Sequence, residues 1–240
     1  MKLTVLTFAL FSYFGTSSSQ DINAIPIEGG VSGTGITTRY WDCCKPSCAW
    51  VVNAEIDPPV ATCEADGITK IDDGAQSGCD TNGDGTAYTC NNQQAIVINE
   101  TFSIGFVAAS FTGGVDESMC CACVLLNFQG ELEGKQLLAQ ITNTGSPLVV
   151  NQFDIAIPGE RRRWDLQRRL SQSMGAPING WGTQCCGVDN EEQCLELPIE
   201  LQPGCDWRFE WMLGVANPNV TFYQVECPGE LTAITGCIRA

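Results

Sequence analysis

The sequence contains no histidine, so any chemistry it performs must come from other side chains. Histidine is the usual general base and metal ligand near neutral pH, and its absence excludes Ser-His-Asp and Cys-His catalysis. The 28 aspartates and glutamates remain as candidates for acid–base work. One protonated carboxyl can donate a proton while a second, ionised one activates water, which is the division of labour that glycoside hydrolysis requires. Composition alone does not say which acids would do this.

Fifteen cysteines indicate a disulfide framework in an exported protein, and their odd number leaves at least one thiol without an intramolecular partner. The N-terminus agrees with export, because Lys2 precedes an apolar run over residues 3–14 and small polar residues follow. We predict a signal peptide over residues 1–19, a single domain over residues 20–240 and an extracellular location. No later run approaches the roughly 20 apolar residues of a membrane helix.

The net charge of −16 excludes most polyanionic partners. Such a surface repels phosphate backbones, so we expect no nucleic-acid partner, whereas a neutral polymer would not be repelled. We also expect no membrane association, no cofactor or metal, and a monomer.

Short apolar runs rich in β-branched and aromatic residues predict many strands. They occupy residues 95–98, 102–106, 123–128, 136–141, 148–150, 153–157, 207–211 and 220–225. In residues 207–211, aromatic rings alternate with charges, which is typical of a half-buried strand. Helical periodicity is weak and occurs near residues 91–94 and 191–197. Short strands joined by long Gly/Asp/Asn loops favour a small β-barrel.

One segment narrows the choice of acids: residues 37–50 read TTRYWDCCKPSCAW. This run closely resembles the signature of glycoside hydrolase family 45, which comprises secreted inverting endoglucanases. Further segments resemble the family in the same order: SGC at 77–79, YTC at 88–90, CCAC at 120–123, FD at 153–154, PGCDWRF at 203–209 and ECP at 226–228. The likeness covers roughly residues 33–238. It implies a mainly β fold, a six-stranded double-psi β-barrel with long disulfide-linked loops.

The resemblance also implies roles for two aspartates. Asp42 would be the general base that deprotonates water, and Asp154 the general acid that protonates the leaving glycosidic oxygen. Inversion needs the two carboxyl groups roughly 6.5–9.5 Å apart. Asp154 follows Phe153 in an apolar run, where partial burial would help to keep it protonated. The alternative for each is an ordinary surface or turn aspartate.

The expected substrate is cellulose or a related β-1,4-glucan, whose apolar sugar faces favour aromatic binding surfaces. Tyr40 and Trp50 match family positions that line the substrate cleft, and Thr38 and Lys45 lie beside them. The alternative for the two aromatic residues is ordinary packing. We place two further tryptophans, Trp207 and Trp211, in the core.

Twelve cysteines form six disulfides by the same resemblance, although sequence alone does not fix the pairing. The implied pairs are Cys44–Cys79, Cys48–Cys120, Cys63–Cys90, Cys121–Cys237, Cys123–Cys227 and Cys194–Cys205. Zinc binding by the cluster at residues 120–123 is the less favoured alternative. The expected partner of Cys43 is missing, and either Cys185 or Cys186 could capture it.

Two further departures from the family lie near Asp154. Pro147 stands where the family often has another aspartate, and residues 160–174 are arginine-rich where the family has glycines. Residues 162–168 read RRWDLQR, which CGG CGG TGG GAT CTA CAA CGG encodes. A shift by one base reads Gly-Gly-Gly-Ile-Tyr-Asn, the family text. We therefore hypothesise a local frameshift, with a genuine basic insertion as the alternative.

The leading functional hypothesis is a secreted endo-β-1,4-glucanase. A non-hydrolytic, expansin-like glycan-binding or wall-loosening protein is the first alternative, since expansins share the barrel and the acid-bearing Phe-Asp. They lack the Tyr-Trp-Asp-Cys-Cys motif present here. The second alternative is an inactive paralogue.

Overall fold

A computed structural model describes residues 22–53, 56–80, 84–112, 117–145, 150–160 and 187–239. The predicted signal peptide, Pro147, the arginine-rich run after Glu160 and the pair Cys185 and Cys186 lie outside these residues. The boundary predicted near residue 19 therefore stays a prediction.

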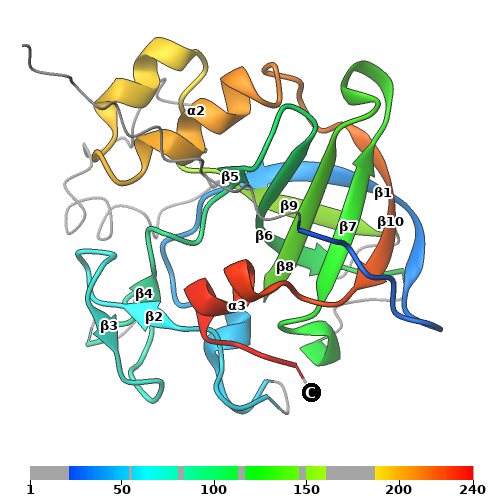
Figure 1. Cartoon of the computed structure of the whole chain (residues 1–240). Coiled ribbons are helices and arrows are strands. Elements are labelled where there is room, and N and C mark those ends of the chain that lie inside the picture. Colours follow the sequence, from blue (N-terminus) through cyan, green and yellow to red (C-terminus); the bar gives the residue numbers. More distant parts are fainter. Residues whose placement is uncertain are drawn as a thin grey trace, which may run out of the picture.

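Six strands close into a mixed β-barrel (Figure 1). They are β1 (Ser32–Tyr40), β6 (Phe102–Ser110), β7 (Cys123–Phe128), β8 (Gln136–Thr144), β9 (Gln152–Ala156) and β10 (Asn219–Val225). Their order is β6-β8-β7-β10-β1-β9, and β9 pairs back onto β6. The β1–β9 and β6–β8 pairs are parallel, and the others are antiparallel. Because β9 pairs with β6, the backbone groups at both edges of the sheet find hydrogen-bond partners. The closed sheet confirms the predicted six-stranded barrel.

The barrel core is filled by alternate side chains that point inward from each strand. Phe153 of β9 is fully buried, and its ring lies 4.8 Å from that of Phe222 and 6.0 Å from that of Phe111. Because Phe153 points into the core, its neighbours Gln152 and Asp154 must point to the other face of β9.

The remaining elements surround the barrel in long loops (Figure 1). Strand β5 (Ile96–Val97) extends the barrel sheet beside β6, and β2 (Thr62–Cys63), β3 (Lys70–Ile71) and β4 (Tyr88–Thr89) form a separate small sheet. The helical segments are η1 (Ser47–Ala49), η2 (Glu117–Met119), η3 (Gly130–Leu132), η4 (Glu191–Glu196), α2 (Gln202–Glu210) and α3 (Gly229–Thr235). No helix within the described ranges is long and apolar enough to cross a membrane.

The strand predicted for residues 207–211 is wrong, because most of this segment belongs to α2. Trp207 and Trp211 are four residues apart, so a helix places both on one face. Their rings stack 5.2 Å apart, and both are buried, as predicted. Their indole N–H groups donate to Ser103 Oγ and to the Asn99 carbonyl. Of the two predicted helical segments, residues 91–94 form turns, and residues 191–197 correspond to η4.

All six disulfides implied by the family resemblance are present. They bond every sulfur of the cysteines at residues 120, 121 and 123, so none of these is available as a thiolate for zinc. The pair Cys48–Cys120 ties η1 to the segment before β7, and Cys44–Cys79 ties the loop after β1 to a second loop. The bridges therefore hold the long loops against the barrel.

Candidate active site

The two predicted catalytic acids lie where two neighbouring parallel strands end. Thr38 of β1 faces Asp154 of β9, and Tyr40 faces Ala156 at the end of both strands. Asp42 follows two residues after β1, while Asp154 lies two residues before β9 ends. Since the strands run in the same direction, both aspartates are carried to the same end of the barrel.

Tyr40 links the two acids. Burial raises the pKa of its phenol above the ordinary value, and the charges of Asp42 and Asp154 raise it further. Hydrogen bonds with the side chains of Asn143 and Thr142 act in the opposite direction. The charges of both carboxylates therefore act on one neutral phenol, although the two aspartates are 112 residues apart in sequence.

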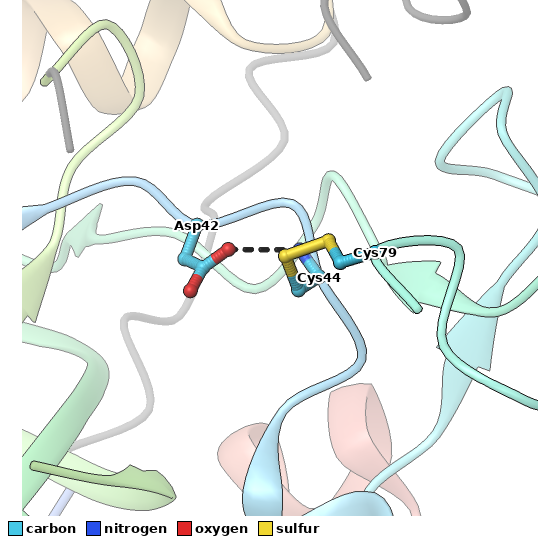
Figure 2. A group of neighbouring side chains, drawn as sticks. All are labelled: Asp42, Cys44 and Cys79. Atoms are coloured by element: carbon cyan, nitrogen blue, oxygen red, sulfur yellow. Dashed lines mark hydrogen bonds between the residues drawn. A yellow bond between two sulfur atoms is a disulfide. The ribbon is translucent and has the colours of Figure 1, made fainter. Parts of the chain in front are cut away.

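The loop after β1 fixes Asp42. Its Oδ1 accepts a hydrogen bond from the Cys44 backbone N–H at 3.0 Å, and Cys44 is disulfide-bonded to Cys79 (Figure 2). Its main-chain carbonyl accepts a hydrogen bond from Thr89 Oγ1 at 3.0 Å. Asp42 also lines a small pocket with Tyr40, Trp41, Pro46, Thr89, Gln93, Thr142 and Ala156. Hydrogen bonds from two segments thus hold Asp42 at the wall of this small pocket.

Asp42, Cys44 and Cys79 also form a cluster of potential metal-ligand atoms, all within 4.8 Å of one another. Both sulfurs belong to a disulfide, and a disulfide sulfur is not the thiolate that binds metals. The cluster in Figure 2 therefore positions a carboxylate and does not coordinate an ion.

Asp154 is half-buried, and two donors converge on one of its oxygens. The Thr38 hydroxyl and the Gln152 amide both donate to Oδ1, the latter at 2.6 Å. Sequence reasoning proposed Thr38 as a substrate-binding residue, whereas the structure places its hydroxyl on the acid. The sequence did not indicate Gln152, because a neutral amide two residues before an aspartate is not a recognisable catalytic motif.

Lys45 is 6% exposed, and its ammonium group faces the protein. The Nζ donates to the carbonyls of Asp73 and Ala75 at 2.5 and 2.9 Å, and it lies 4.1 Å from the centre of the Trp50 ring. Burial lowers the pKa of this amine, against the opposing charges of Asp73 and Asp72. These contacts support a structural role for Lys45. Direct substrate contact by Tyr40, Lys45 and Trp50 stays a prediction.

Cys43, next to Asp42, has no disulfide partner among the described residues. Burial and, secondly, the charge of Asp42 raise its pKa to about 12. The thiol is therefore mostly protonated near neutral pH.

Comparison with known proteins agrees with this geometry. Residues 34–238 match the model of Glycosyl hydrolase family 45. An endoglucanase of Phaedon cochleariae is 47% identical over 99% of both chains, and one of Cryptopygus antarcticus is 44% identical over 88% of this chain and 92% of its own. The crystal structure of the cellulase from the Antarctic springtail Cryptopygus antarcticus superposes with a TM-score of 0.79, at 44% identity, over 88% of this chain and 99% of that one.

The chain belongs to glycosyl hydrolase family 45. The predicted enzyme class, a glycoside hydrolase of the endoglucanase type, is thereby confirmed.

Proposed function

We propose that the chain is a secreted, inverting endo-β-1,4-glucanase in which Asp42 is the general base and Asp154 the general acid. The observation that supports this most directly is the parallel register of β1 and β9, which carries both carboxyl groups to one end of the barrel. Two carboxyl groups at that end, one on β9 and one in the loop after β1, supply the two proton transfers of the reaction.

The reaction is one displacement. Asp42 removes a proton from water as the water oxygen bonds to the anomeric carbon. The bond from that carbon to the glycosidic oxygen breaks at the same time, and Asp154 gives its proton to this oxygen. The product has the opposite anomeric configuration, and the two aspartates end with exchanged protonation states.

A β-1,4-glucan is the proposed substrate, because the relatives at 47% and 44% identity are endoglucanases. The half-buried Tyr40 supplies apolar ring surface in the pocket that Asp42 lines. The disulfide-rich loops support secretion, since such bonds persist in oxidising compartments.

The test is release of reducing ends from carboxymethylcellulose by the wild type and by D42A and D154N. Each acid–base role contributes typically 10²–10⁴-fold, so each variant should lose at least about 100-fold in kcat. Asp84 is exposed in a loop, and D84N is the matched control that should keep full activity. An inactive wild type would favour a non-hydrolytic glycan-binding protein or an inactive paralogue, and an active D42A would remove the proposed base.

A further inference from the structure

Gln152 lies on the same face of β9 as Asp154, because side chains two residues apart in a strand point the same way. Its amide nitrogen is 2.6 Å from Asp154 Oδ1, and Thr38 Oγ1 donates to the same oxygen from β1. Donors from two strands thus meet at one carboxyl oxygen.

An amide NH₂ group donates and does not accept, so the oxygen that it contacts serves as an acceptor. In a protonated carboxyl group the accepting oxygen is the carbonyl oxygen, and the proton is on the other one. We propose that Gln152 is a positioning residue for the general acid: with Thr38, it holds Asp154 Oδ1 as an acceptor, so that Oδ2 carries the proton given to the leaving group. This inference rests on the proposed role of Asp154 as general acid.

The two donors also assist the step itself. As the Oδ2–H bond breaks and the proton moves to the glycosidic oxygen, the carboxyl group becomes a carboxylate. Hydrogen bonds to an ionised acceptor are roughly twice as strong as those to a neutral one. The bonds from Gln152 and Thr38 therefore strengthen during proton transfer, and such differential stabilisation lowers the barrier.

Two variants separate a positioning role from a packing role. Q152M keeps the length of the side chain and removes the donor, and Q152E keeps its shape but places a second carboxyl group beside the acid. Loss of the donor removes the stabilisation that Asp154 gains as it becomes a carboxylate, and a second carboxyl group beside it opposes that change further. We expect turnover to fall in Q152M and to fall further in Q152E.

The kinetic expectation is a loss of about tenfold in kcat for Q152M on cellopentaose, with KM within about twofold of the wild type. A 2,4-dinitrophenyl cellotrioside needs little protonation of its leaving group. On this substrate Q152M should lose less than about threefold, because the acid step then contributes little. Q136M is the control: Gln136 Nε2 donates at 2.6 Å to Asn127 Oδ1, outside the pocket at Asp42, and its loss should leave the ratio of the rates on the two substrates unchanged.

Equal losses on the two substrates would show that Gln152 acts only in packing and would overturn the inference. The proposed function fails separately. If D154N kept its activity on cellopentaose, Asp154 would not be the acid, whatever Gln152 does. If D154N lost activity on cellopentaose but kept it on the dinitrophenyl substrate, the acid role would stand, and the Q152M result would then decide the inference alone.

Discussion

The hydroxyl of Thr38 donates a hydrogen bond to Oδ1 of Asp154, the residue that faces it in the parallel register of β1 and β9. Asp42 lies two residues after the end of β1, so this bond connects the strand that leads to Asp42 with the side chain of Asp154. The relative position of the two acids therefore depends on strand register, which the closed barrel fixes.

Replacing Thr38 should affect turnover more than binding. T38V keeps the shape of the side chain and removes the donor, so kcat should fall about tenfold while KM changes little. T38S retains the hydroxyl and should keep most of the activity. Steady-state kinetics on cellopentaose check this. A raised KM with unchanged kcat would instead support the substrate-binding role that the sequence predicted for Thr38.

Lys45 should matter for stability. K45M removes the donor for two carbonyl groups and the cation above the Trp50 ring, so the free energy of unfolding should fall by about 2–3 kcal/mol. K70M, at an exposed lysine, is the control and should change stability by less than about 0.5 kcal/mol. Urea denaturation measures both. Unchanged stability together with a large rise in KM would assign Lys45 to the substrate.

Cys43 should resist alkylation in the folded protein. Its pKa of about 12 exceeds the ordinary value of about 8.5, so at pH 9 the native thiol is almost wholly protonated while the unfolded thiol is largely ionised. Iodoacetamide should label Cys43 about a thousandfold more slowly in the native protein than in denaturant, as peptide mass spectrometry would show.

The raised pKa of Cys43 also makes the stability of the folded protein depend on pH. The thiol has a higher pKa in the folded state, so its contribution to stability is complete below about pH 8.5 and is lost as pH rises toward about 12. D42N removes the neighbouring charge and should speed native labelling. Native labelling as fast as that in denaturant would contradict the burial of this thiol.

The sequence predicted strands β7, β8, β9 and β10 well, because each is a compact apolar run. It did not predict β1, since residues 32–40 read SGTGITTRY and carry no hydrophobic pattern. This strand is recognised only through its pairing with β9 and β10, which is tertiary information. At residues 207–211 the sequence carries a pattern that fits two kinds of element. Rings four residues apart fit a helix, whereas their alternation with charges fits a strand, and the strand was predicted wrongly.

The sequence predicted those residues of the candidate site that belong to a recognisable motif, and it did not predict the others. Asp42 and Asp154 came from the family resemblance, and the structure brings both to one phenol. Gln152 and the orientation of Lys45 depend on which groups meet across strands and loops. No spacing in the sequence expresses such contacts.

The frameshift hypothesis makes a prediction about the nucleic acid. Sequencing the transcript through codons 160–174 should show a reading frame that encodes Gly-Gly-Gly-Ile-Tyr-Asn in place of the arginine-rich run. An mRNA that encodes the arginines in frame would contradict the hypothesis and establish a genuine basic insertion.

The paired roles of Asp42 and Asp154 are tested most directly by the configuration of the first product. Proton NMR during hydrolysis of cellopentaose by the wild-type enzyme resolves the α- and β-anomers of the new reducing end before they interconvert. Single displacement by water, with one acid and one base, predicts that the α-anomer appears first. Initial formation of the β-anomer would show retention and would contradict the proposed mechanism.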